Sequence, residues 1–148
     1  LLDALQKRIS FLSAVVEELG LTHVRLVHAR AEDGARNPEH RERYDLAVAR
    51  AVAPLPVLCE LMLPFVAVGG RMLCYKGPAA QDELEAGGRA ARMLGGGALE
   101  VLPADVPGQP DWRHIIVACR KKEKIARQYP RKAGTPGRAP LGMGNTKK

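Results

Sequence analysis

Long apolar stretches are missing from this sequence, as are the signals that direct a chain into a membrane or out of the cell. No apolar run reaches the roughly 18 residues of a membrane-spanning helix. The chain opens with Leu1, Leu2 and Asp3, without the basic flank and the small-residue cleavage site of a signal peptide. The first residue is also not methionine, and we therefore expect that Leu1 is not the natural start of the protein.

Cysteine is scarce, and histidine does not occur at metal-binding spacings. The three cysteines, Cys59, Cys74 and Cys119, are odd in number, widely spaced and set among apolar residues. This pattern predicts reduced thiols in the core of a cytosolic protein rather than a disulfide or metal framework. The four histidines show no ligand spacing, so no metal site is predicted.

Positive charge is abundant but gathers at one end of the chain. The 148 residues are 46% hydrophobic, which suits one folded domain. Residues 1–119 carry 13 Lys and Arg against 15 Asp and Glu, a net of −2, whereas residues 120–148 carry 10 against one, a net of +9. Two interpretations of this tail stay open. It can attract a polyanion such as nucleic acid, or it can be a disordered, solubilising extension.

The apolar pattern predicts strands that alternate with helices. Expected strands end at Leu2 and span residues 24–29, 44–51, 72–75, 98–102 and 114–120. One expected helix follows Asp3, one has Pro54 in its first turn and one spans 82–94, and a short one runs through Arg41. Gly69 and Gly70 are expected to form a turn. Strand 44–51 is nearly continuous in Ala, Val and Leu, which is typical of burial on both faces. The alternation predicts an α/β fold with a doubly wound, mostly parallel sheet and an antiparallel edge.

In such sheets, ligands bind outside the carboxyl ends of the strands. Asp3 follows the first strand, where a carboxylate can accept the two hydroxyls of a ribose; the alternative is simple capping of the next helix. Ala31 and Glu32 follow the second strand and could meet an adenine edge, with a backbone N–H and a carboxylate acceptor. The alternative there is a solvated glutamate in a loop.

Two cations end neighbouring strands. Arg50 ends the third strand and Lys76 ends the fourth, so both would face the same crevice. They could bind a carboxylate or phosphate group beside the helix that begins at Pro54. The alternative is a surface ion pair with an acid such as Asp45 or Glu60. No glycine-rich turn follows a leading strand, and we expect such a cofactor turn to lie before Leu1.

Five stretches resemble a known family: "LLDALQKRISFL", "HARAEDGA", "YDLAVARAVAPLPVLCELMLPFV", "GGRMLCYKG" and "YPRKAGTPGRAPLG". They are similar to the bacterial glucose-inhibited division protein B family, the 16S ribosomal RNA guanine-N7 methyltransferases. The resemblance implies a class I S-adenosylmethionine-dependent methyltransferase fold, Rossmann-like and truncated at its N-terminus. Residues 1–120 would form the catalytic domain without its first strand and glycine-rich loop, and residues 121–148 would form a basic tail that contacts RNA.

The resemblance also implies roles for particular residues. The residues at the S-adenosyl-L-methionine site would be Asp3, Ala4, Leu5, Ala31, Glu32 and Arg50. Lys76 would contact RNA or phosphate, and Tyr129, Arg131 and Lys132 would lie near the RNA. The implied substrate is 16S ribosomal RNA or a precursor of the small ribosomal subunit. A cytoplasmic monomer without a membrane partner is expected.

Two other classes of function stay open: a non-catalytic RNA-binding module with a basic tail, and a nucleotide-dependent oxidoreductase on a similar sheet. The methyltransferase interpretation accounts for both the strand ends and the tail. It also explains why no nucleophile or paired carboxylates stand at the strand ends, because guanine N7 has a free lone pair. Without a strand between the first and third strands, residues 1–148 alone are expected to bind the cofactor poorly or not at all.

Overall fold

The computed structural model describes residues 1–50, 53–104, 107–108 and 113–144. In these ranges the strands are β1 (Leu2–Asp3), β2 (Val27–His28), β3 (Tyr44–Arg50), β4 (Val66–Lys76), β5 (Gly96–Pro103) and β6 (Ile115–Lys121). The helices are α1 (Gln6–Glu18), α2 (Ala31–Gly34), α3 (Leu55–Met62), the 3₁₀-helix η1 (Pro78–Glu83), α4 (Leu84–Met93) and α5 (Thr135–Arg138). Among the helices so described, none has the length and apolar character needed to span a membrane.

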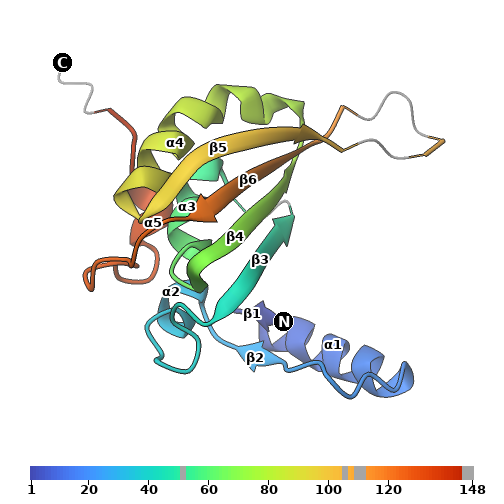
Figure 1. Cartoon of the computed structure of the whole chain (residues 1–148). Helices are drawn as coiled ribbons and strands as arrows, with labels where there is room; N and C mark the ends of the chain where they lie inside the picture. Colours follow the sequence, from blue (N-terminus) through green and yellow to red (C-terminus); the bar gives the residue numbers. More distant parts are fainter. Residues whose placement is uncertain (51–52, 105–106, 109–112, 145–148) are drawn as a thin grey trace.

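The strands form two separate sheets (Figure 1). β1 and β2 pair in parallel as a two-stranded sheet. The second sheet has the order β3-β4-β6-β5, in which β3 and β4 are parallel and β6 runs antiparallel to both of its neighbours. The expected α/β class with an antiparallel closing hairpin is confirmed. β1 and β3 are not hydrogen-bonded to each other, so each keeps one open edge.

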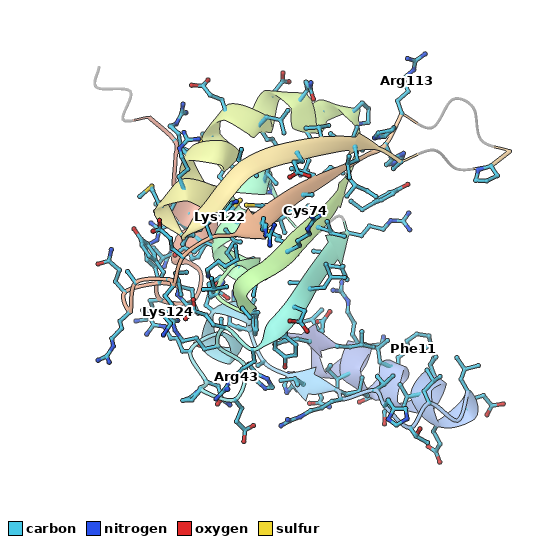
Figure 2. All side chains as sticks on the ribbon, viewed as in Figure 1. Phe11, Arg43, Cys74, Arg113, Lys122 and Lys124 are labelled. Atoms are coloured by element: carbon cyan, nitrogen blue, oxygen red, sulfur yellow. The ribbon has the colours of Figure 1, made fainter. Side chains whose placement is uncertain are left out.

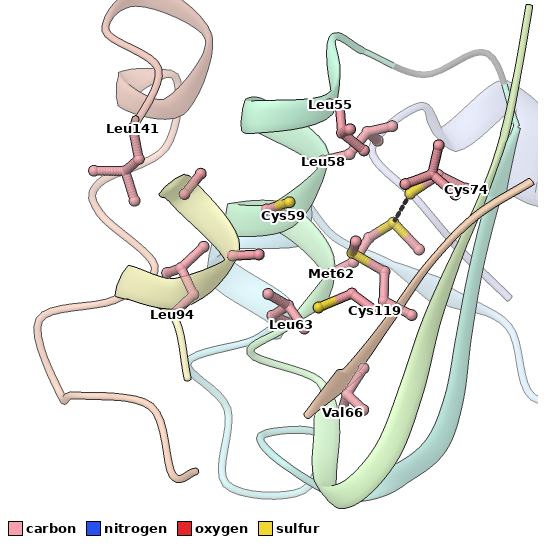
Figure 3. Packing of buried hydrophobic residues seen from close by; sticks show 14 of the residues in the cluster. Leu55, Leu58, Cys59, Met62, Leu63, Val66, Cys74, Leu94, Cys119 and Leu141 are labelled. Atoms are coloured by element: carbon pink, nitrogen blue, oxygen red, sulfur yellow. Dashed lines mark hydrogen bonds between the residues drawn. The ribbon is translucent and has the colours of Figure 1, made fainter. Parts of the chain in front are cut away.

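Helices α3 and α4 cover one face of the four-stranded sheet and enclose the core (Figure 3). Leu55, Leu58 and Leu63 from the α3 region meet β4 and β6 there. The three cysteines are free and buried in this cluster, as predicted. Burial raises the pKa of the Cys74 thiol to about 12, which makes its reactive thiolate form rare near neutral pH.

The opposite face of β3 is exposed, and here the expectation of burial on both faces is wrong. Ala47 and Ala49 pack against the core, whereas Leu46 and Val48 are 52% and 69% exposed. The residue pattern is that of a central strand, but among the described residues nothing pairs with the free edge of β3. The last residue of the expected strand, Ala51, lies outside the described residues.

Helix α1 is similarly uncovered. Its apolar residues have the predicted helical spacing, and the helix ends just before Gly20, which has a positive φ of 61°. However, only Ile9 is buried, and Phe11 is 67% exposed.

Gly69 and Gly70 lie inside β4 rather than in a turn before it. The pairing of β3 with β4 shifts register between Tyr44 and Leu46, opposite these glycines. Gly69 has a φ of 93°, and a Cβ on Gly70 would lie 2.6 Å from the carbonyl oxygen of Asp45. The two glycines therefore permit a bulge and a close backbone contact, which is a common role of glycine in strands.

The C-terminal segment, defined here as residues 122–144, packs against the body of the protein. Ile125, Tyr129 and Leu141 belong to the core cluster, and Pro130 and Pro136 are among the fully buried side chains. The segment therefore completes the core that α3 and α4 begin. The remaining tail residues, 145–148, lie outside the described residues.

Candidate functional site

A hollow of about 410 Å³ lies at the carboxyl ends of β1 and β2, beside α3 and the C-terminal segment. Its volume is within the usual range for small-molecule sites. The lining residues are Leu2, Asp3, Ala4, Leu5, Arg8, Arg30, Ala31, Glu32, Val57, Leu61, Gly134, Pro136 and Gly137. The hollow thus brings together five of the six residues expected to bind the cofactor.

Asp3 stands where β1 gives way to α1. Its Oδ1 accepts a hydrogen bond from Leu5 N at 2.8 Å, and its Oδ2 lies 3.2 Å from Arg8 Nη1. The bond from Leu5 N–H is the largest cause that lowers the pKa of this carboxyl, and Arg8 contributes. Asp3 therefore braces the backbone just before α1, but it is not the helix cap, because the N-cap residue is Leu5 and no side chain caps the helix. Each oxygen of an ionised carboxylate also has a second acceptor site that a sugar hydroxyl can use.

Ala31 and Glu32 begin α2, directly after the strand β2. Glu32 is only 6% exposed. Its Oε1 accepts a hydrogen bond from Gly134 N at 2.8 Å, and its Oε2 lies 4.0 Å from Arg30 Nε. Glu32 is therefore not a solvated loop residue. It joins the hollow to the C-terminal segment.

Arg50 does not line this hollow. It is exposed at the end of β3, and its Cζ lies 5.2 Å from the centroid of the Tyr75 ring. The Tyr75 ring is also stacked on the ring of His114, with the two ring centroids 5.1 Å apart. A cation above an aromatic ring is attracted to the π electrons of the ring, which favours a defined position for the guanidinium of Arg50.

Lys76 is already paired. Its Nζ lies 2.9 Å from Glu83 Oε2 and donates a hydrogen bond to the carbonyl oxygen of Ala53 at 3.1 Å. Glu83 also accepts a hydrogen bond from Leu55 N at the start of α3. The partner acid is thus Glu83, whereas the alternative interpretation named Asp45 or Glu60.

The three tail residues expected near RNA have different environments. The Tyr129 side chain is in the core, 9% exposed. Arg131 binds Glu60 on α3, with its Nη2 2.6 Å from Glu60 Oε2 and its Nε 2.9 Å from Glu60 Oε1. Lys132 is exposed. Contact with RNA by these residues and by Lys76 stays a prediction.

The lining residues that were not predicted include three from the C-terminal segment, Gly134, Pro136 and Gly137. Gly134 and Glu32 are hydrogen-bonded although they are 102 positions apart in the sequence. Local sequence patterns do not predict contacts over such a separation. The charge of the tail and the stretch "YPRKAGTPGRAPLG" led to an expected role in RNA contact, not in the cofactor hollow. The stretch "GTPG" has a turn-forming composition, but nothing in it points to a particular strand end.

A second hollow, of about 670 Å³, lies between the open edges of β1 and β3. Leu1, Leu2 and Asp3 form one side, and Leu46, Ala47 and Val48 form the other. Both sides are strand edges with mostly apolar side chains. This hollow is therefore typical of a gap between two unpaired strands. Asp3 lines both hollows, but only the first also brings Ala31 and Glu32 to the ends of the strands.

Comparison with known proteins relates the chain to one family. The family model described as GidB, rRNA small subunit methyltransferase G, matches residues 1–109. Ribosomal RNA small subunit methyltransferase G of Leuconostoc mesenteroides subsp. mesenteroides is 49% identical over 141 residues, which are 95% of this chain and 58% of that protein. The protein of the same description from Alkaliphilus oremlandii is 47% identical over 95% of this chain and 59% of its own length. The chain thus spans less than two thirds of these relatives.

A solved structure supports the fold. An rRNA methylase from Streptococcus thermophilus aligns with a TM-score of 0.54 and 18% identity, over 82% of this chain and 72% of that one. At this identity the likeness concerns the arrangement of strands and helices.

Proposed function

The chain belongs to the rRNA small subunit methyltransferase G family, and on this premise we propose that it takes part in methyl transfer from S-adenosylmethionine to N7 of a guanosine in 16S ribosomal RNA. The observation that carries the proposal is the shared hollow of Asp3, Ala31 and Glu32. The proposed substrate is 16S ribosomal RNA or a precursor of the small subunit. The proposed setting is the cytoplasm, with the protein as a monomer.

The lining of the hollow fits the nucleoside part of S-adenosylmethionine. Val57, Leu61 and Pro136 supply apolar surface for a flat base, and Asp3 supplies an ionised acceptor for sugar hydroxyls. Arg50, which stands on Tyr75 outside this hollow, is proposed to act nearer the reacting end. A rigid guanidinium there can orient an anionic group.

When bound, S-adenosylmethionine supplies an electrophilic methyl group. The N7 lone pair of guanine is free of Watson–Crick pairing, so no residue has to remove a proton before attack. The task of the chain is then to bind and align the two reactants, which alone can supply a large part of a rate enhancement. This agrees with the described lining of the hollow, which includes no Ser, Cys or His.

RNA affinity is proposed to come from exposed cations of the C-terminal segment. Lys122, Lys124, Arg127 and Lys132 are exposed, and none of them has an ion-pair partner among the described residues. Neutralisation of phosphates by such cations releases counterions and favours binding at low salt. A target guanosine has to be unpaired or extruded to reach the end of the cofactor hollow.

The test of this proposal is cofactor binding, measured by isothermal titration with S-adenosylmethionine. We expect weak binding to residues 1–148 alone, because β1 and β3 have open edges beside the hollow. Joining the chain to the part of the Leuconostoc relative that the match does not cover should strengthen binding. In this joined protein, Asp3→Asn should weaken binding about tenfold or more, since a charged hydrogen-bond acceptor is lost.

Asp33→Asn is the matched control, because Asp33 is an exposed carboxylate in α2 that does not line the hollow. It should leave the affinity unchanged. Tight binding to residues 1–148 alone would contradict the expected need for a further strand. Equal affinities of the two variants would contradict the assignment of Asp3 to the sugar.

A further inference from the structure

We propose that residues 134–137 of the C-terminal segment form one wall of the nucleoside hollow, and that Glu32 is a positioning residue that holds this wall in place. The inference rests on the proposed function, because it takes the ligand to be the nucleoside part of S-adenosylmethionine. It changes the role expected of Glu32, from an acceptor for the adenine amine to an acceptor for the protein's own backbone.

The contacts of Glu32 lead to this assignment. Its buried Oε1 accepts the N–H of Gly134 at 2.8 Å. Gly134, Pro136 and Gly137 line the hollow together with Asp3 and Ala31. Since charged acceptors make strong hydrogen bonds to backbone N–H groups, the bond from Gly134 gives the buried carboxylate a partner inside the protein.

Other contacts hold the same segment from behind. Arg131 forms a two-pronged ion pair with Glu60, which is 0% exposed in α3. Pro136 is fully buried, and α5 packs against α3; Figure 1 shows the two helices side by side. The wall is therefore anchored to the same helix that supplies Val57 and Leu61 to the hollow.

The glycines of the wall leave room for a ligand. Gly134 has a φ of 81°, a conformation that other residues rarely adopt. A Cβ on Gly137 would meet no atom within 4 Å, although Gly137 lines the hollow. A larger side chain at position 137 would thus have space to fill without a clash in the protein. Part of that space is where the proposed ligand would lie.

The first experiment fills this space in the 148-residue chain. The probe is S-adenosylhomocysteine at millimolar concentration, followed by NMR through the backbone amides of residues 3–5, 31–32, and 134, 135 and 137. In the unaltered chain we expect saturable shifts in all three groups. Gly137→Leu should weaken binding about tenfold, because the leucine competes for the volume of the ligand.

Gly144→Leu is the matched control. It also adds a leucine to the C-terminal segment at a glycine whose Cβ would meet nothing within 4 Å, but Gly144 does not line this hollow. Its affinity should equal that of the unaltered chain. The proposal is overturned if Gly137→Leu binds as tightly as Gly144→Leu, or if the amides of residues 134, 135 and 137 do not respond to the probe.

The second experiment separates the two roles of Glu32. Glu32→Ala and Glu32→Gln are compared with S-adenosylhomocysteine and with S-inosylhomocysteine, which lacks the adenine amine. If Glu32 holds the wall, Glu32→Ala weakens both ligands by the same factor, and Glu32→Gln restores much of the loss because its amide oxygen can still accept from Gly134. A loss confined to the adenosyl ligand would mean that Glu32 reads the amine, and would overturn the proposal.

Failure of this inference differs from failure of the proposed function. Shifts at residues 3–5 and 31–32 without shifts at 134–137 would remove the wall and leave the cofactor site in place. If millimolar S-adenosylhomocysteine causes no saturable amide shift anywhere, the proposal that residues 134–137 are part of a nucleoside site in this chain is overturned. Methyl transfer by the joined protein would still decide the proposed function independently.

Discussion

Buried charges connect the C-terminal segment to the body of the protein. Glu60, which is completely buried, accepts hydrogen bonds from Arg131 N, Nε and Nη2. The hydrogen bond to Glu60 raises the pKa of Arg131, so the guanidinium stays charged. Lys121, also buried, donates to the carbonyl oxygen of Leu63 at 2.8 Å and lies 3.4 Å from Glu42. Each charge is tolerated only because its partner is present.

The Glu60–Arg131 pair predicts a large loss of stability when one partner is removed. Arg131→Leu leaves the Glu60 carboxylate buried without its cation, and we expect a cost of about 3 kcal/mol. We choose the low end of the usual range because the Arg131 side chain is 26% exposed. Urea unfolding followed by circular dichroism measures the change.

Lys132→Leu is the matched control for this variant, since Lys132 is the adjacent residue, is exposed and has no ion-pair partner among the described residues. Its unfolding midpoint should change little. If both variants lose the same stability, the pair with Glu60 is not what holds the segment.

At the scale of elements, β3 has the composition of an interior strand and the surroundings of an edge strand. Ala47 and Ala49 reach the core, while Leu46 and Val48 are exposed above an open strand edge. The apolar pattern correctly identifies the strand and its direction in the fold. The pattern does not show whether another strand or helix covers β3.

Because the valines of the four-stranded sheet differ in exposure, we expect the same substitution to change the free energy of unfolding by different amounts. Val48 is 69% exposed and Val117 is 0% exposed. Val48→Thr should change the free energy of unfolding by less than about 0.5 kcal/mol. Val117→Thr should cost about 1–3 kcal/mol, because it buries a hydroxyl in an apolar cluster.

Chemical unfolding of both variants at two protein concentrations tests this expectation. A large cost for Val48→Thr that appears only at the higher concentration would show that β3 is covered by another copy of the chain. A large cost at both concentrations would contradict the exposed position of Val48.

The sequence was informative where neighbouring residues decide the structure. The helical spacing in α1 and α3 and the apolar run of β3 are local patterns, and the residues after β1 and β2 were correctly expected at strand ends. The wall of the hollow was not predictable in this way. Glu60 and Arg131 are 71 positions apart, and a basic tail has the same composition whether it is packed or free.

For the whole molecule, the charge of the C-terminal segment is divided between packing and solvent. Arg131 is committed to a buried contact, as is Lys121 of β6 just before the segment, whereas Lys122, Lys124 and Arg127 are exposed. Figure 2 shows Lys122 and Lys124 close to the end of β6. Removal of the segment would therefore disrupt the core as well as the charge, so RNA affinity is better tested by neutralising exposed residues.

We expect the triple variant Lys122→Gln, Lys124→Gln, Arg127→Gln to bind RNA more weakly and with a smaller dependence on salt. If each cation neutralises one phosphate, the slope of log K against log salt should fall by about 2 to 3 units. Fluorescence anisotropy with a labelled 16S ribosomal RNA fragment at several salt concentrations measures this slope. The urea midpoint should stay the same.

Lys7→Gln is the control, because Lys7 is an exposed cation on α1, outside the segment. It should leave the slope unchanged. A slope that is equal in the triple variant and in the unaltered chain would place the RNA on another surface.

The order in which a ribosome makes this polypeptide gives the packed segment a further significance. Glu32 and Glu60 are synthesised well before Gly134 and Arg131, their partners in the finished protein. Until those late residues emerge, two acidic groups must remain hydrated, which keeps the nascent helices apart from their final neighbours. The hollow therefore acquires its full lining only after residues 134–137 have been synthesised, because Gly134, Pro136 and Gly137 are part of that lining.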